Sequence, residues 1–356
     1  MRYWIGLFNY SPEEVCYRNC SISIFNSKEH VCMRIIGLSF KKKLTFILSS
    51  VLYQVYSHIP YSILALIYRH IDYFHYKMLS FYEFPFKTKS RQGESQNNEC
   101  YGNLWAVINA VGNAFNPHCI IEHGVYFGEW IGDNYNMSDI DTIYTYGEYR
   151  KNVALRWYGG QTNKKIVPIG PYILYAQNFK SIKALSKLKK KLGRVLLVFP
   201  SHPDPFEPVS YDMNAFLEEI GSVSKGFDTI LISLFWVDIR RGKDKMYKEK
   251  GYQIVCSGTR SDRWFLNRQK DLLELADFSM SNNVGTHVGY SIAMGVPHYI
   301  FDQSVHEEVQ EDERTHQVRM KEYREIKDAF SSKEPVITKR QQELVDFYWG
   351  HDIRKI

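Results

Sequence analysis

The sequence predicts an α/β protein with two doubly wound, Rossmann-like domains that face a cleft. Three observations support this fold class. The chain has 356 residues, more than a single hydrophobic core usually serves. Its composition, 44 % hydrophobic and 24 % charged, is typical of a folded chain. From residue 100 onward, short apolar runs alternate with segments of helical spacing, a pattern typical of parallel sheets covered by helices.

The first block of alternation runs from residue 100 to about residue 180. Apolar residues recur at helical spacing in Asn103–Phe115, and the β-branched run Cys119–Ile121 reads as a short strand. The remaining elements that we expect in this block are a strand over "DTIYTY", a helix over Glu148–Trp157, and a strand in "KKIVPIGPYILYA" that ends at a Gly-Pro turn.

The second block begins with a lysine-rich helical connector over residues 178–193. The strands that we expect here are 194–199, 228–235, 252–256, "DFSMSN" and "PHYIF", and the helices are 212–220, "RQKDLLELA" and "THVGYSIAMGV". The C-terminal segment is helical, and Thr338 with Gln341 fits a capping box. We therefore expect an N-terminal extension over 1–32, two domains over 33–180 and 181–310, and C-terminal helices over 311–356.

Charge and cysteine content narrow the functional class. The net charge of +6 is mild, so we expect no nucleic-acid partner. Basic residues crowd two stretches, which we interpret as solvated faces; the alternative is attraction to anionic lipid or an anionic ligand. The first stretch contains Lys180, Lys183, Lys187, Lys189, Lys190, Lys191 and Arg194, and the second contains Arg240, Arg241, Lys243, Lys245 and Lys248. The six cysteines form no CxxC pair, so we expect reduced thiols in a cytoplasmic protein without a signal peptide.

One segment raises the question of membrane attachment. Leu44–Tyr68 contains no Asp, Glu, Lys or Arg and is long enough to span a bilayer. Polar residues and Pro60 interrupt it, however, so we predict two short helices that pack on the first domain or lie on the membrane surface. The preceding lysines, Lys41–Lys43, would meet the headgroups in a peripheral contact at the inner face of the plasma membrane.

Ligands of open α/β sheets bind beyond the carboxyl ends of the strands, and this rule selects three loops. The loops are Glu122–Gly124, Ser201–Pro203 and Ser279–Thr286. The last of them precedes a helix, whose first turn offers unpaired N–H groups and a positive dipole end to a phosphate. Its short polar residues and its glycine are the candidate phosphate-binding residues: Ser279, Ser281, Asn282, Asn283, Gly285 and Thr286.

The other two loops carry groups that can move a proton. His202, held by Pro203, can donate to the phosphate of a departing nucleotide or protonate it. Glu122 can take a proton from a sugar hydroxyl across the cleft, and His123 can do the same or orient the carboxylate. Each loop alone is equally well explained as a helix cap or a turn. Together they favour a phosphate-binding site.

These residues resemble the motifs of a known family. Glu122–Gly124, His202-Pro203, and Ser279 with Ser281 are similar to the acidic-acidic-Gly, His-Pro and Ser-Ser/Thr motifs of bacterial sialyltransferases, which are GT-B glycosyltransferases of surface polysaccharide synthesis (capsule or O-antigen). The resemblance spans roughly residues 100–305. It implies a GT-B fold, a CMP-linked acid sugar as donor, a base at Glu122, a phosphate-binding histidine at His202 and a nucleotide-binding serine pair.

The resemblance also implies the partners and the division of labour. Domain 33–180 would face an oligosaccharide or lipid-linked glycan acceptor, domain 181–310 would bind the nucleotide-sugar, and neither metal nor cofactor would be needed. Two departures leave the donor open: His123 replaces the second acidic residue, and the serine pair reads Ser-Met-Ser. The alternatives are a UDP- or GDP-sugar transferase, a polyol-phosphate transferase of teichoic acid type and a non-catalytic capsule-assembly subunit.

A competing metal motif lies in the first block. Asp139-Ile-Asp141 has the DxD form that holds Mn²⁺ in the other glycosyltransferase fold, GT-A. It directly precedes a predicted strand, where Asp and Ser are ordinary turn residues. We therefore interpret it as a turn and predict no metal site.

Overall fold

The computed structural model describes residues 22–27, 30–35, 68–81, 96–131, 140–202, 209–307 and 311–355. They belong to two compact units, Met1–Leu66 and Ile67–Ile356. In the first unit the described residues form an antiparallel hairpin of β1 (Ile22–Ser27) and β2 (His30–Ile35), with Ile22 opposite Ile35. The segment Leu44–Tyr68, for which we predict membrane contact, lies outside the described residues except for Tyr68.

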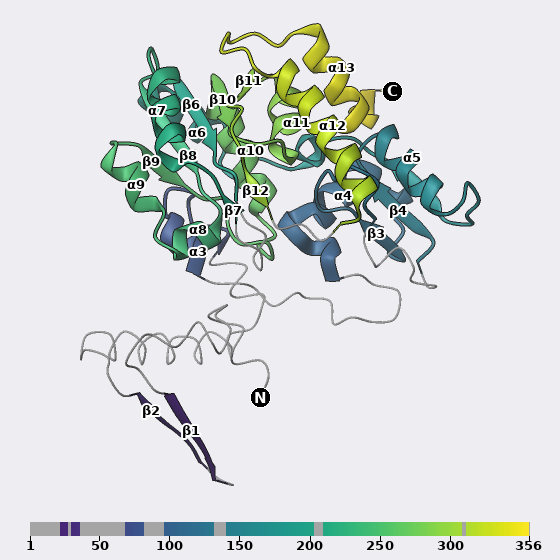
Figure 1. The fold of residues 1–356 in the computed structure, drawn as a ribbon, viewed down its shortest axis with the longest axis horizontal. Helices are drawn as coiled ribbons and strands as arrows, with labels where there is room; N and C mark the ends of the chain where they lie inside the picture. The colour runs from purple at the N-terminus through teal and green to yellow at the C-terminus, as the bar shows by residue number, and fades with distance from the viewer. Residues whose placement is uncertain are drawn as a thin grey trace. The chain divides into compact units, whose positions relative to one another are not determined.

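The second unit contains two parallel sheets. Within the described residues, the smaller sheet has the order β3-β4-β5 and the larger one the order β11-β10-β6-β8-β9 (Figure 1). The predicted α/β class with parallel sheets is confirmed. The strands are β3 (Cys119–Ile121), β4 (Thr142–Thr145), β5 (Lys165–Pro168), β6 (Val195–Phe199), β8 (Thr229–Ser233), β9 (Gln253–Val255), β10 (Phe278–Ser281) and β11 (His298–Ile300), and a short pair joins β7 (Val209–Ser210) to β12 (His306–Glu307).

Helices connect and cover these strands. The α-helices are α3 (Tyr76–Phe81), α4 (Asn103–Val111), α5 (Glu148–Trp157), α6 (Ile182–Leu192), α7 (Met213–Val223), α8 (Trp236–Arg240), α9 (Asp244–Glu249), α10 (Phe265–Leu275), α11 (Thr286–Ala293), α12 (Glu313–Ala329) and α13 (Lys339–Tyr348). The 3₁₀ segments are η2 (Gln96–Gly102), η3 (Gly112–Ala114), η5 (Tyr172–Tyr175) and η6 (Ile353–Lys355). The short helices α8 and α9 follow β8, where the sequence pattern predicts no helix.

Local sequence explains where the longer helices begin. Ser181 accepts a hydrogen bond from the N–H of Ala184 at the start of α6, and Asp212 accepts one from Ala215 at the start of α7. The capping box predicted from Thr338 and Gln341 is present at the start of α13.

Strand β6 occupies the centre of the larger sheet because all five of its residues are buried and apolar. Leu197 lies opposite Leu231 of β8 on one side and Ser279 of β10 on the other. From β6 the chain continues outward through β8 to β9, and it then crosses to β10 on the other side of β6. The carboxyl ends of β6 and β10 therefore lie at a switch point, where an open α/β sheet binds its ligand.

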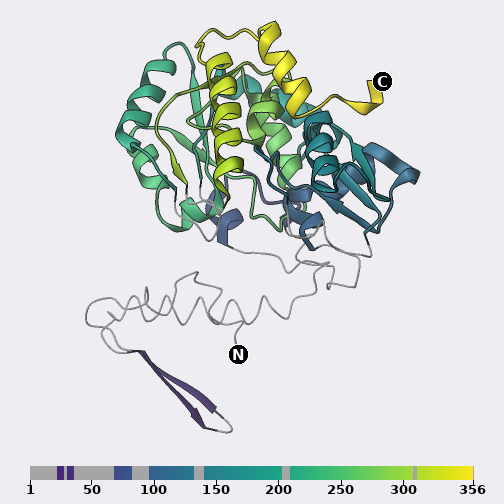
Figure 2. The ribbon, with the colours of Figure 1, turned by 45° about the vertical axis from the view of Figure 1, so that its right-hand side comes forward.

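A continuous hydrophobic core joins the two sheets of the second unit. It contains Tyr144 of β4, Leu197 of β6 and Val288 of α11. The C-terminal helix α13 contacts both α5 and α11, and Figures 1 and 2 show α12 and α13 lying against both halves of this unit. Gly289 of α11 permits the close contact, since a Cβ there would come within 2.2 Å of the Trp349 ring. The domain boundary expected near residue 180 falls between the two sheets, inside this single unit.

Candidate functional site

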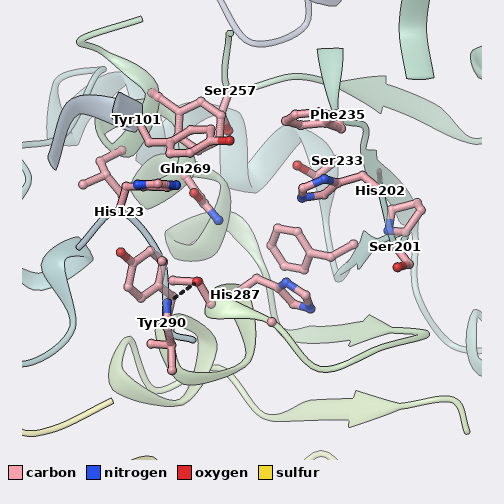
Figure 3. A pocket seen from close by; sticks show the side chains of 18 of the residues that line it. Tyr101, His123, Ser201, His202, Ser233, Phe235, Ser257, Gln269, His287 and Tyr290 are labelled. Atoms are coloured by element: carbon pink, nitrogen blue, oxygen red, sulfur yellow. Dashed lines mark hydrogen bonds between the residues drawn. The ribbon is translucent and has the colours of Figure 1, made fainter. Parts of the chain in front are cut away.

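A cavity of about 330 Å³ lies at the carboxyl ends of strands from both sheets (Figure 3). The segments that follow β3, β6, β8, β9 and β10 all contribute to its wall, together with the first residues of α4 and α11 and one face of α10. Its size is at the lower end of the range for small-molecule pockets. The cavity therefore lies where the strand-end rule places a ligand.

His202 is presented to this cavity from the end of β6. Strand β6 ends at Phe199, and the backbone N–H of Ser201 donates to the Asn282 Oδ1 at 2.6 Å, which fixes the loop. The imidazole of His202 stacks on the Phe235 ring, with 4.0 Å between ring centroids and 16° between planes. The expected neighbour Pro203 lies outside the described residues. His202 is thus held by stacking and lines the cavity.

The loop before α11 brings three of the predicted residues to the cavity: Asn283, Gly285 and Thr286. Helix α11 begins at Thr286, so its positive dipole end faces the lining. The Thr286 Oγ1 accepts a hydrogen bond from the N–H of Val125 at 3.0 Å and keeps its own proton to donate. Gly285 leaves room for the His287 ring, which would lie 2.9 Å from a Cβ at that position.

Ser279 and Ser281 do not line the cavity, contrary to the sequence prediction. Both are fully buried, and they contact the two ring nitrogens of His298: Ser279 Oγ lies 2.8 Å from Nδ1, and Ser281 Oγ lies 3.0 Å from Nε2. Ser281 also donates to the Asn283 carbonyl at 2.8 Å. The reason for the difference is that β10 lies inside the sheet, between β11 and β6, and its two serines share the face on which His298 of β11 lies. Through Ser281, this cluster holds the loop before α11 from behind the cavity wall.

Asn282 likewise lies behind the cavity wall. It is fully buried, and its Oδ1 accepts the hydrogen bond from Ser201 described above. It therefore joins the loop after β10 to the loop after β6, and does not itself line the cavity.

Glu122 also differs from the prediction that it faces the cleft. Its carboxylate forms a buried ion pair with Arg150 of α5, with Oε1 2.6 Å from Nη2, and the hydroxyl of Thr145 donates to Oε2. Arg150 also donates to the carbonyls of Tyr126 at 3.4 Å and Trp130 at 3.0 Å. Because successive side chains at a strand end point to opposite sides, Glu122 points inward and the next residue points into the cavity. Glu122 and Arg150 together hold the loop that follows β3.

His123 lines the cavity, as do Gly124, Val125 and Tyr126 after it. The Tyr126 hydroxyl lies 2.9 Å from its Nε2, and Figure 3 shows the His123 ring directed into the cavity beside Tyr101. Burial, followed by the charge of Glu122, raises the pKa of Tyr126 well above its usual value, so Tyr126 stays protonated. His123 is thus an oriented imidazole at the wall contributed by the smaller sheet.

The sequence pattern gave no role to His287, which lies in the first turn of α11 and lines the cavity. Its ring stacks on Phe199, with 5.0 Å between centroids, and its Nε2 is buried without a hydrogen-bond partner among the described residues. Burial, and then the nearby His202, lowers the pKa of His287 to about 3. The available signal was its position two residues after Gly285, in the first turn of a helix that follows a polar loop.

Acid should destabilise the fold through His287. The unfolded chain takes up a proton below the ordinary histidine pKa of about 6.5, whereas the folded chain resists protonation until about pH 3. Its contribution to stability is therefore complete at pH 7 and falls as the pH drops, by about 2 kcal/mol at pH 5. His298, whose pKa burial also lowers, acts with the same sign. Urea unfolding at pH 7.5 and pH 5.0 measures the loss.

The matched variants for that measurement are His287→Gln and His118→Gln. The first should unfold with a weaker dependence on pH, because one buried titrating group is gone. The second removes an exposed imidazole and should keep the wild-type dependence. An unchanged pH dependence in His287→Gln would contradict the buried, neutral state of this side chain.

Among the described residues that line the cavity, none is Asp, Glu, Lys or Arg. The histidines in the lining are His123, His202 and His287, and burial keeps the last of these neutral near pH 7. Asp141 of the DxD motif lies just before the amino end of β4, at the opposite edge of the sheet, where its Oδ1 accepts from the Thr142 hydroxyl at 3.0 Å. Asp139 lies outside the described residues.

In the described part of the chain, no group of three or more His, Cys, Asp or Glu side chains is arranged to hold a metal ion. Within the same residues, every helix is too short or too polar to cross a bilayer.

Comparison with known proteins gives little guidance. Neither a scan against protein-family models nor a search of curated proteins finds a match to this sequence. Among solved structures, the wall teichoic acid polymerase TagF is similar, with a TM-score of 0.35 and 14 % identity over 53 % of this chain and 50 % of that chain. The present chain thus matches about half the length of that structure.

Proposed function

We propose that this protein is a metal-independent glycosyltransferase of GT-B type. It transfers a sugar from a nucleotide-sugar, with a CMP-linked acid sugar as the favoured donor, to an oligosaccharide or lipid-linked surface glycan. One observation supports this most strongly. His123 from the smaller sheet lines the same cavity as His202, His287 and the N-terminus of α11 from the larger sheet. A base on one wall thus faces a phosphate-binding wall.

On the phosphate-binding wall, His202 and α11 meet the donor. The backbone N–H groups of the first turn of α11 and its dipole attract the phosphate. The hydroxyl of Thr286 adds a further hydrogen-bond donor for this phosphate. His202 donates to the phosphate oxygen that receives the electron pair when the sugar–oxygen bond breaks. The motif resemblance of His202 to a phosphate-binding histidine supports the same role.

On the other wall, His123 serves as the base. It takes the proton of the acceptor hydroxyl as that oxygen attacks the anomeric carbon. Tyr126 fixes the ring from one side at 2.9 Å, and Glu122 with Arg150 fixes the loop from beneath. The proposal thus moves the base by one residue from Glu122 to His123. A peripheral location at the inner face of the plasma membrane suits a lipid-linked acceptor.

A thermal-shift screen over CMP-, UDP-, GDP- and dTDP-linked sugars tests this function. A ligand that binds only the folded state at 100 times its Kd stabilises that state by about 2.7 kcal/mol, so the true donor should raise the melting temperature. We expect the largest rise with a CMP-linked sugar, and the same rise in the presence of EDTA.

Other outcomes of the screen are equally informative. A rise with UDP- or GDP-sugars alone would keep the fold and change the donor. CDP-glycerol is added to the screen as a nucleotide-linked polyol, and a rise with this compound alone would replace glycosyl transfer by polyol-phosphate transfer. No rise with any nucleotide would contradict the proposal.

A further inference from the structure

The cavity contains buried polar groups that have no hydrogen-bond partner among the described residues. Asn103 is 1 % exposed, and neither its Nδ2 nor its Oδ1 has a hydrogen-bond partner among the described residues. The hydroxyl of Ser257, 4 % exposed, is in the same state. Both residues line the cavity, as does the amide side chain of Gln269. Most buried polar groups in proteins are paired, so these exceptions need an explanation.

The backbone holds Asn103 in this costly position. Asn103 is the first residue of α4, and the preceding Gly102 has φ +78°, with Arg263 O only 2.5 Å from where its Cβ would lie. The N–H of Tyr101 donates to the Arg260 carbonyl at 2.6 Å, and Tyr101 itself has φ 56°, which is unusual for a residue other than glycine. The start of α4 is thus held against the segment that follows Ser257. Its strained backbone keeps Asn103 at the cavity wall.

The three residues Asn103, Ser257 and Gln269, here called the polar floor, are uncharged. In the view of Figure 3, Gln269 lies between His123 and His202, with Ser257 and Tyr101 beside it. The N-terminus of α11 in the same cavity already offers N–H donors to a phosphate, which leaves the polar floor for another part of the ligand. Neutral hydroxyl groups suit them well, because an Asn amide can donate to one hydroxyl and accept from its neighbour.

We propose that the polar floor binds the hydroxyl and other neutral polar groups of the transferred sugar ring. The sugar would then lie between the catalytic base at His123 and the phosphate at His202. The side-chain rings of Tyr101 and Phe265, whose centroids are 4.9 Å apart, offer apolar surface to the sugar ring. This inference rests on the proposed function. It adds that the polar floor selects the sugar and leaves the nucleotide to the other wall.

The first test measures the melting temperature of the protein without ligand. Asn103→Leu keeps the size and removes two unpaired polar atoms, so its melting temperature should rise by about 2–4 °C. The matched control is Asn98→Leu: Asn98 is also buried, but it donates to the Cys119 carbonyl and accepts from the Ile121 N–H, each at 2.8 Å. That variant should melt lower than wild type. A lower melting temperature in Asn103→Leu as well would overturn the inference, because Asn103 would then have a structural role.

The second test separates sugar from nucleotide. Calorimetric titration compares CMP-sialic acid with CMP, or UDP-glucose with UDP if the screen selects a UDP-linked donor. Asn103→Leu should weaken binding of the nucleotide-sugar about tenfold or more and leave that of the free nucleotide within about twofold. Ser257→Ala, a smaller change that removes one hydroxyl, should act in the same direction.

Each contrary result has a distinct meaning. Equal losses of affinity for the nucleotide-sugar and for the free nucleotide would mean that the polar floor binds the nucleotide part. That result would overturn the inference, while the proposed function would stand. Unchanged binding of both in the two variants would overturn it in the same way. A wild-type protein that binds neither compound would remove the proposed function and the inference together.

Discussion

His202→Ala should lower the rate of sugar transfer by about 100-fold or more, the usual scale for losing a general acid or an oriented charge-stabilising group. The imidazole stacks on Phe235 at 4.0 Å and lines the cavity close to His287 and the start of α11. In the proposed reaction, the oxygen of the departing phosphate would then lose a hydrogen-bond donor at the moment its charge develops. Steady-state transfer rates with the donor identified by thermal shift measure this loss.

The control for this prediction is His118→Ala. His118 is exposed, precedes β3 and does not line the cavity, so its loss should leave transfer close to wild type. Both variants should melt near the wild-type temperature, because neither side chain is buried. A folded His202→Ala protein with wild-type turnover would contradict the assignment.

The larger features of the fold follow from patterns that sequence reasoning can detect. The continuous apolar run Val195–Phe199 predicts a central strand, and strand–helix alternation predicts parallel sheets, since only a parallel sheet covered on both faces needs such strands. Parallel strands share one edge for their carboxyl ends. For that reason, the amino-acid sequence alone is enough to expect His123, His202 and the loop before Thr286 in one cavity.

The side-chain directions cannot be predicted in the same way, because they depend on partners far along the chain. Ser279 meets His298, which comes 19 residues later, and Glu122 meets Arg150, 28 residues later. Strand alternation does predict that Glu122 and His123 diverge. Deciding which of them turns inward requires Arg150. Asn103 has the pattern of an ordinary helix residue, since nothing in the local sequence shows that its amide lacks a partner.

Glu122→Gln should lower the free energy of unfolding by about 3 kcal/mol or more. The side chains of Glu122 and Arg150 are 2 % and 0 % exposed, and the carboxylate receives both the guanidinium and the Thr145 hydroxyl. Glutamine keeps the shape and one acceptor but removes the charge, so it leaves the Arg150 cation buried and uncompensated. Urea unfolding at pH 7 measures the change.

The matched control is Glu148→Gln. Glu148 pairs with Lys151 on the exposed face of α5, with its side chain 60 % exposed, and such pairs contribute little to stability. The double variant Glu122→Gln with Arg150→Met removes both charges and should recover part of the stability that the single change loses. That recovery would identify the ion pair as the cause.

Activity then separates structure from catalysis at this position. When it is assayed well below its melting temperature, Glu122→Gln should retain transfer within about tenfold of wild type, because in the proposed reaction the acceptor proton passes to His123 and the ion pair only holds the loop. His123→Ala, which removes the imidazole at the cavity and leaves the ion pair in place, should lose transfer by about 100-fold or more while keeping wild-type stability. A stable Glu122→Gln protein without activity, beside an active His123→Ala protein, would instead return the base to the carboxylate. The buried pair with Arg150 would then have to open before the reaction, since the carboxylate in its observed position does not reach the cavity.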